Sequence, residues 1–228
     1  RAVDVERLAG QSKFTVLRPG GALPLPIMLN LPGRHNVLNA LAVISVATEL
    51  EIDDAAIQRA LAGFQGIERR LQWIADVDLD AGRVTIVDDY GHHPTEIAAT
   101  VEAVRQGWPA RRVVLVFQPH RYTRTRDLLD EFAQVLADSD ALVVAEIYAA
   151  GEAPIPGADG KALCRAIRTR GRVEPVLLKS LDELPDALAG IVREGDVVLT
   201  MGAGHIGAVS NELPRTLPAA VAMRGRRA

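Results

Sequence analysis

Two acids, a tyrosine and two histidines are gathered in segment 88–96, DDYGHHPTE, directly after the apolar run 84–87. In open α/β sheets, ligands collect at the carboxyl ends of the strands. An exposed carboxylate there can hold ribose hydroxyls or, through water, a magnesium ion. The alternative is that Asp88 and Asp89 are solvated loop acids and that one histidine caps the following helix. We favour a ligand site, because a generic loop rarely gathers so many ionisable groups.

Arginine is the dominant charge in the segment that follows the next apolar run, 113–117. No acid occurs between Glu102 and Asp127, and that interval holds arginines at positions 105, 111, 112, 121, 124 and 126. Arginine binds carboxylate and phosphate bidentately, and Thr123 or Thr125 can cap a helix whose N-terminus favours an anion. The alternative is a solvated basic face. Because the stretch 118–126 follows a strand expected to be buried, the sequence predicts an anion site.

Three further motifs carry less chemistry. Residues 202–207, GAGHIG, match the dinucleotide pattern G-x-G-x-x-G, but they follow the last expected strand and lack the βαβ unit that the pattern requires. A tight strand-to-helix turn explains them better. The Gly-Lys pair at 160–161 has the wrong spacing for a phosphate-binding loop, and no Cys/His spacing is typical of zinc. Cys164 is expected to be a small buried apolar residue.

Elements that could position these loops are visible from residue 83 onward. Apolar, β-branched runs at 84–87, 113–117, 141–147, 173–178 and 197–201 alternate with helical patterns at 95–105, 125–136, 161–169 and 181–192. Short continuous apolar strands between helices indicate a parallel sheet covered on both faces. The fold class expected is therefore α/β, a Rossmann-like doubly wound and mainly parallel sheet.

The first third of the chain follows a different pattern. Runs 13–18 and 23–29, separated by the turn-rich 19–21, predict a hairpin. Apolar periodicity predicts a helix over 37–50, and Asp53 is expected to cap a second helix that stops at Gly63. We place the boundary between the two parts near 66–73. Residues 214–228, with four arginines and no acid, are expected to be a disordered basic tail.

Composition excludes several classes of protein. The 228 residues are 48% hydrophobic and 24% charged, as in a globular chain. A net charge of −3 gives no global argument for nucleic acid, and the apolar runs are too short to span a bilayer. One cysteine excludes a disulfide framework and fits a reducing cytoplasm. A homodimer is left open.

Four motifs together resemble the Mur ligase family: 33–40 (GRHNVLNA), 88–96, 117–125 (FQPHRYTRT) and 200–204 (TMGAG). The resemblance runs over nearly the whole chain to about Leu213, and it is strongest to members that join L-alanine to UDP-N-acetylmuramate. It implies an ATP-dependent ligase that converts the substrate carboxylate to an acyl phosphate, which the amino group then attacks. The first 67 residues would be the tail of a central ATPase domain, and 68–213 the carboxyl-terminal domain.

The resemblance also assigns residue roles. It implies catalytic roles for His92 and His120. The implied L-alanine site contains Tyr90, His120, Arg121 and Arg124, and the implied ATP contacts are Asn36, Asn39, Arg70, Asp89 and His93. No metal ligand is assigned, and most magnesium ligands, the phosphate-binding loop and the UDP-sugar site are expected upstream of Arg1.

Three functions therefore stay open. The first is a portion of the L-alanine-adding ligase that is inactive alone. The second is a recycling ligase that attaches a peptide to the same sugar, although the 117–125 segment argues against it. The third is a non-catalytic module that binds nucleotide or a partner.

Overall fold

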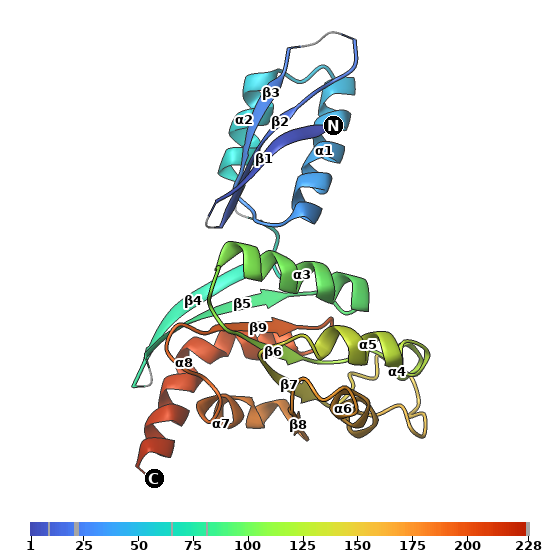
Figure 1. Cartoon of the computed structure of the whole chain (residues 1–228), viewed down its shortest axis with the longest axis vertical. Coiled ribbons are helices and arrows are strands. Elements are labelled where there is room, and N and C mark those ends of the chain that lie inside the picture. Colours follow the sequence, from blue (N-terminus) through green and yellow to red (C-terminus); the bar gives the residue numbers. More distant parts are fainter. Residues whose placement is uncertain (9, 21–22, 65, 81, 227–228) are drawn as a thin grey trace. The chain divides into compact units, whose positions relative to one another are not determined.

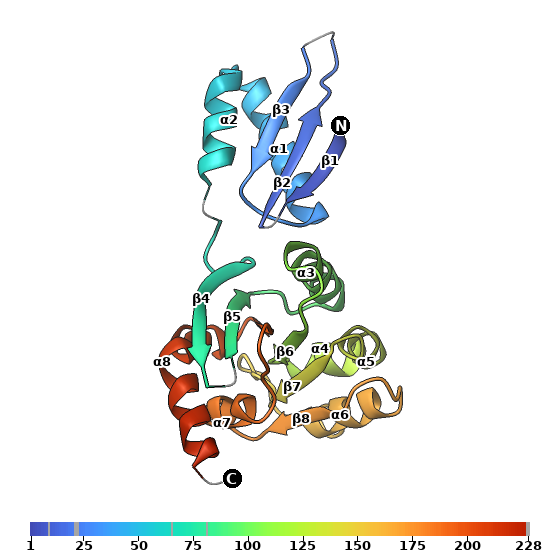
Figure 2. The same cartoon turned by 60° about the vertical axis from the view of Figure 1, so that its left-hand side comes forward.

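The computed structural model describes residues 1–8, 10–20, 23–64, 66–80 and 82–226. Contacts divide the chain into two compact units: one contains Arg1–Ile67 with Ala99–Ala110, and the other contains Glu68–Ala98 and the chain from Arg111 onward. Helix α3 (Pro94–Gly107) crosses that division. Figures 1 and 2 show the helices and strands of both units.

The first unit is a three-stranded antiparallel sheet with two helices. Its elements are β1 (Ala2–Leu8), β2 (Gln11–Val16), β3 (Leu25–Leu29), α1 (Arg34–Glu49) and α2 (Asp54–Gly63). The expected hairpin is the pair β2–β3, in which Phe14 opposes Ile27; part of its predicted turn, 21–22, lies outside the described residues. The Asp53 side chain accepts the Ala56 N–H at 3.2 Å, which confirms the predicted cap of α2.

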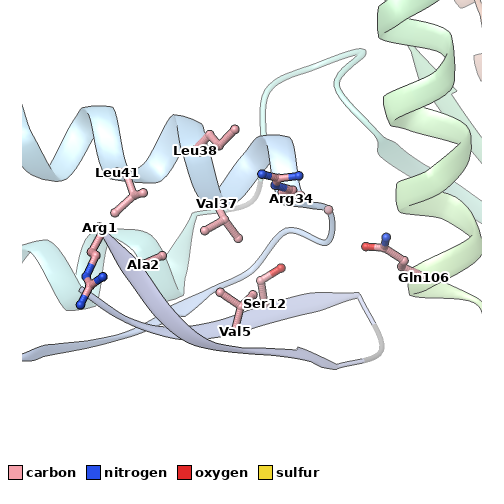
Figure 3. Close-up of a pocket in the computed structure, with 10 residues that line it drawn as sticks. Arg1, Ala2, Val5, Ser12, Arg34, Val37, Leu38, Leu41 and Gln106 are labelled. Carbon is pink, nitrogen blue, oxygen red and sulfur yellow. The ribbon is translucent and has the colours of Figure 1, made fainter. Parts of the chain in front are cut away.

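The core of this unit lies between the sheet and the helices. Phe14, Ile27, Ile44 and Ile57 are among its buried side chains. A hollow beside β1 and α1 is lined by residues that include Val5, Val37 and Leu41 (Figure 3). Strand β1 was not predicted from the sequence, although the alternation of apolar and charged residues over 3–6 is typical of a half-buried strand.

The second unit is built on a six-stranded sheet with the order β4-β5-β9-β6-β7-β8. The strands are β4 (Gln72–Leu79), β5 (Gly82–Asp89), β6 (Val113–Phe117), β7 (Ala141–Ala145), β8 (Pro175–Leu178) and β9 (Val197–Met201). All neighbours pair in parallel except β4, which is antiparallel to β5. The expectation of a mainly parallel α/β sheet is confirmed.

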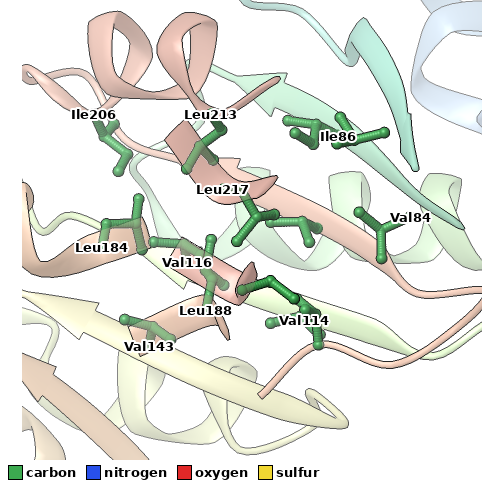
Figure 4. Close-up of a cluster of buried hydrophobic side chains, with 14 of the residues drawn as sticks. Val84, Ile86, Val114, Val116, Val143, Leu184, Leu188, Ile206, Leu213 and Leu217 are labelled. Atoms are coloured by element: carbon green, nitrogen blue, oxygen red, sulfur yellow. The ribbon is translucent and has the colours of Figure 1, made fainter. Parts of the chain in front are cut away.

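Helices cover both faces of this sheet. They are α4 (Tyr122–Asp127), α5 (Leu129–Leu136), α6 (Gly160–Arg168), α7 (Leu184–Ala189), which follows a 3-10 turn at Leu181–Glu183, and α8 (Ile206–Gly225). On one face, Val114 and Val116 pack in a cluster with Leu188 of α7 and Leu213 of α8 (Figure 4). On the other face, the ring of Phe117 lies 5.5 Å from that of Phe132 in α5. Burial on both faces explains why these strands are continuous apolar runs.

The expectation of a disordered tail from residue 214 is wrong for the described residues. Residues 214–225 continue α8, even though Pro214 and Pro218 lie inside the helix. Leu213, Leu217 and Val221 recur at four-residue spacing and are buried, so they hold the helix on the sheet. Residues 227–228 of the predicted tail lie outside the described residues.

Among the described residues, no helix is long and apolar enough to cross a membrane.

Candidate active site

The carboxyl ends of four parallel strands meet at one edge of the sheet, which we call the carboxyl edge. Asp89 of β5 and Phe117 of β6 both lie opposite Met201 of β9, and Phe117 also pairs with Val144 of β7. The loops that follow these strands hold the predicted site residues 90–93 and 118–126. The topology therefore brings two segments that are thirty residues apart in sequence to the same place.

A row of aromatic rings runs along the carboxyl edge. Tyr90 and His92 follow β5, His120 follows β6, Tyr148 follows β7 and His205 follows β9. Successive ring centroids are 5.5, 5.4, 5.5 and 4.8 Å apart. The structure thus joins three residues predicted from the sequence with two that were not.

Tyr148 and His205 were not predicted as site residues, because their loops carry no cluster of charges. Their position directly after expected strands was the available signal. Tyr148 is fixed by its backbone, whose N–H donates to the Pro119 carbonyl at 2.8 Å, and its ring stacks on His120 with an interplanar angle of 25°.

His92 is oriented by the start of α3. The carboxylate of Glu96 accepts the backbone N–H groups of His92 and His93 at 2.9 and 3.0 Å, an arrangement typical of a capping box. Although partial burial opposes its charge, these two bonds hold the pKa of Glu96 below its usual value. Nδ1 of His92 lies 3.1 Å from the Tyr90 carbonyl oxygen and 3.8 Å from Glu96 Oε2.

His120 is held by Arg124, one turn further along the chain. Nη1 of Arg124 lies 3.2 Å from His120 Nδ1 and donates to the His120 carbonyl at 3.1 Å. Burial, the neighbouring His92 ring and the positive charges of Arg124 and Arg121 lower the pKa of His120, against an opposing effect of Glu152. His120 is therefore biased toward the neutral form.

Arg121 is placed by the backbone and by Glu152. Its backbone φ angle is +75°, which residues other than glycine rarely adopt. Its backbone N–H donates to the Tyr148 carbonyl at 2.9 Å. Nη1 lies 3.9 Å from Glu152, while both oxygens of that carboxylate accept from Thr123. The hydroxyl and N–H of Thr123 keep the pKa of Glu152 low. Arg121 remains half exposed at the carboxyl edge.

The two acids at the end of β5 are not the exposed carboxylates that the sequence suggested. Asp88 is buried, with one oxygen 2.9 Å from Arg69 Nε and the other accepting the Thr200 hydroxyl at 2.6 Å. Asp89 is 4% exposed, and its oxygens accept the N–H groups of Leu71 and Gly91 at 2.8 and 2.7 Å. In this conformation both carboxylates brace the loop.

The glycines of 202–207 are required for packing. A Cβ on Gly202 would lie 2.6 Å from the Gln118 carbonyl oxygen, and one on Gly207 would lie 2.2 Å from Arg69 Nε. Arg69 also donates to the carbonyl oxygens of Gly202 and Gly204. These contacts support the prediction of a tight turn in place of a dinucleotide motif.

Not all the arginines between Glu102 and Asp127 belong to the carboxyl edge. Arg111 and Arg112 precede β6 and therefore lie at its amino end. Arg112 forms a bidentate pair with the buried Asp196, at 3.0 and 2.8 Å, and Arg111 donates to the Gly195 and Asp196 carbonyls. The expected anion site therefore does not include Arg111 and Arg112.

The predicted ATP residues fall in both units. Asn36 and Asn39 lie in the first turns of α1, where Asn36 donates to the Pro32 carbonyl at 2.8 Å and Asn39 is exposed. Arg70 and His93 are exposed in the second unit, and the Arg70 guanidinium lies 5.8 Å from the centre of the Tyr90 ring. These four assignments, together with that of Asp89, stay predictions.

No group of three or more metal-ligating His, Cys, Asp or Glu side chains occurs among the residues that the structure describes. Both oxygens of Asp88 already have protein partners in this conformation, Arg69 and Thr200. Cys164 is buried, as predicted, and burial raises its pKa to about 11.

Comparison with protein families gives one match to this part of the chain. Residues 69–204 match the family model described as Mur ligase, glutamate ligase domain. The chain is 57% identical over 217 residues to the UDP-N-acetylmuramate–L-alanine ligase of Methylococcus capsulatus, covering 95% of this chain and 46% of that protein. It is 57% identical over 218 residues to the ligase of the same name from Paraburkholderia xenovorans, covering 93% and 46%. The chain thus spans about half the length of the curated relatives it matches.

Solved structures agree with the sequence relatives. The UDP-N-acetylmuramate-alanine ligase of Thermotoga maritima is 30% identical with a TM-score of 0.76, over 99% of this chain and 45% of that one. A murein peptide ligase from Psychrobacter arcticus, 22% identical with a TM-score of 0.64 over 95% and 44%, shares the fold.

Proposed function

Because the chain belongs to the Mur ligase family, we propose that it supplies the amino-acid site of an ATP-dependent ligase that joins L-alanine to UDP-N-acetylmuramate. The reaction is a step in peptidoglycan precursor synthesis, and so serves cell-wall formation, cell shape and division. We place it in the cytoplasm, where ATP is supplied. In this reaction the sugar carboxylate becomes an acyl phosphate, and the amine of L-alanine displaces phosphate.

The observation that carries the proposal is the cluster of His120, Arg121 and Arg124 beside Tyr90 and His92 at the carboxyl edge. Two guanidinium groups within one helical turn suit the α-carboxylate of an amino acid. Fixing the carboxylate there would hold the amine beside the ring row, so that the protein contributes positioning and charge neutralisation.

The ATP contribution is a second part of the proposal. Asn36, Asn39, Arg70, Asp89 and His93 are its residues, and the exposure of Asn39, Arg70 and His93 supports it. The backbone bonds of Asp89 imply that ribose binding at this carboxylate would have to share or replace them. The 228 residues hold no phosphate-binding loop, so we expect no turnover by this chain alone.

The recycling ligase is the weaker candidate. The 57% identity is to L-alanine ligases, whereas the murein peptide ligase structure is 22% identical. A binding module without catalysis would keep the same arginine cluster, so only activity separates it from the first proposal.

Ligand titration followed by NMR tests the amino-acid site on the chain itself. We expect L-alanine to shift the signals of the loops 90–93 and 118–126, and Arg121→Ala to weaken that binding about tenfold or more, because a charged contact is lost. Asp89→Asn should chiefly weaken binding of ATP. If Arg121→Ala binds L-alanine as tightly as the parent chain, Arg121 has no place in the site.

A further inference from the structure

His92 and His120 have rings 5.4 Å apart, yet their Nδ1 atoms face partners of opposite kind. Nδ1 of His92 faces the Tyr90 carbonyl oxygen at 3.1 Å, and Nδ1 of His120 faces a guanidinium nitrogen of Arg124 at 3.2 Å. A carbonyl oxygen can only accept a hydrogen bond, and a guanidinium can only donate one. These two contacts therefore fix where each imidazole carries its proton.

For His92, the contact requires a proton on Nδ1. The Glu96 carboxylate, 3.8 Å from the same nitrogen, favours that proton as well. In the neutral ring, Nε2 then carries the lone pair. This is the arrangement of a base whose second nitrogen is oriented by a carbonyl or carboxylate group.

For His120, the contact requires a lone pair on Nδ1. The proton of the neutral ring is then on Nε2, which can only donate. Protonation of Nδ1 would set it against Arg124, and the Tyr148 ring stacked on His120 at 5.5 Å restricts its rotation. His120 is thereby kept from acting as a base.

We propose that the two histidines have different roles at the site. His92 Nε2 accepts a proton from the substrate amine, and His120 Nε2–H donates a hydrogen bond to an anionic oxygen of a substrate. The assignment of substrates rests on the proposed function. Glu96, Arg124 and Tyr148 are positioning residues that act through the two rings.

The α-ammonium of L-alanine gives one proton to His92 Nε2, and the freed amine nitrogen forms the C–N bond to the acyl carbon. The C–O bond to phosphate breaks with its electron pair on oxygen. The phosphate takes the second amine proton and leaves as hydrogen phosphate, and His92 releases its proton to solvent.

Imidazole nitrogen NMR of the chain without ligands tests the two tautomers. At neutral pH we expect His92 to carry its proton on Nδ1 and His120 on Nε2, with signals assigned by His92→Gln and His120→Gln. In Arg124→Met, His120 should lose its single tautomer while His92 keeps its own. Nε2–H as the neutral form of His92, or Nδ1–H on His120 in the parent chain, overturns the proposal, even if Arg124→Met fails to fold.

Replacing each histidine by glutamine tests whether His92 acts as a base and His120 as a hydrogen-bond donor, since glutamine keeps an N–H donor and has no basic nitrogen. The assay uses the Methylococcus capsulatus ligase with its matching region replaced by this chain. We expect His92→Gln to lower kcat by about 10²–10⁴-fold, and His120→Gln to raise the KM for L-alanine by no more than about tenfold. Equal losses of kcat in the two variants, or the reverse order, contradict the division of roles. Because the tautomers are measured without substrate, a wrong tautomer assignment can be distinguished from a failure of the chain to bind L-alanine.

Discussion

Arg69 forms an ion pair with Asp88 at the carboxyl edge, with Nε 2.9 Å from a carboxylate oxygen that is almost fully buried. The same guanidinium donates to the Gly202 and Gly204 carbonyls and lies 5.0 Å from the centre of the Tyr90 ring. Arg69 thus ties the first residues of the second unit to β5, to the glycine turn and to the start of the ring row. The neighbouring Arg70 is exposed.

Removing this guanidinium should destabilise the second unit strongly. Arg69→Met leaves the charge of Asp88 buried and unpaired, which costs about 3–5 kcal/mol. Arg83→Met is the control, because its pair with Asp78 is exposed and should contribute within about 1 kcal/mol. Urea unfolding of both variants measures the difference. Equal stability of the two variants would remove Arg69 from its anchoring role.

The close approach of Arg69 to α8 makes Gly207 sensitive to a single methyl group. In Gly207→Ala the new Cβ would overlap Arg69 Nε, so we expect a loss of about 1–3 kcal/mol. Gly225→Ala, in the same helix with nothing within 4 Å, should be neutral or stabilise by up to about 1 kcal/mol. Thermal unfolding of the pair checks this, and a neutral Gly207→Ala would refute the packing explanation of the glycine motif.

The lowered pKa of His120 predicts a pH dependence of stability. The groups that face the ring are His92, Arg124, Arg121 and Glu152. In the unfolded chain His120 titrates near 6.5, above its value in the folded state, so the unfolded state binds more protons below that pH. The free energy of unfolding should therefore fall as pH decreases from about 7 into the window below 6.5.

His120→Gln isolates that contribution, and His93→Gln, at an exposed position, is its control. Urea unfolding at several pH values should show a weaker pH response in His120→Gln than in the parent chain. If His120→Gln and the parent chain show the same pH dependence of stability, His120 has the same pKa in the folded and unfolded states.

Cys164 offers a reporter of global unfolding. Its side chain is buried in α6, and burial raises its pKa to about 11. Because the thiolate is the reactive form, we expect slow alkylation by iodoacetamide in the native chain and rapid alkylation in urea. Rapid labelling under native conditions would show that α6 opens locally.

Some elements of the fold could be predicted because burial leaves a simple pattern. β6 and β9 are buried at every position, and their mostly apolar, β-branched sequences predict them. β4 was missed although residues 75–79 alternate apolar and charged, because its first residues, with the exposed Trp73, follow no such pattern and leave the alternating part short. The second half of α8 was misread because prolines and arginines masked its buried stripe.

The candidate site was predictable where charge accumulates on strand ends. His92, His120, Arg121 and Arg124 stood out for that reason. The burial of Asp88 and Asp89 was not predictable, because it depends on Arg69 and on backbone N–H groups that tertiary structure supplies. Tyr148 and His205 could be assigned to the site only from the strand order, which places the four loops side by side.

The most direct measurement of the central claim is phosphate release by the Methylococcus capsulatus ligase with its matching region replaced by this chain, with ATP and UDP-N-acetylmuramate. We expect release that depends on L-alanine and a KM for L-alanine that rises in Arg121→Ala. A folded hybrid that ignores L-alanine but uses a peptide, or that binds ATP without turnover, would contradict the account.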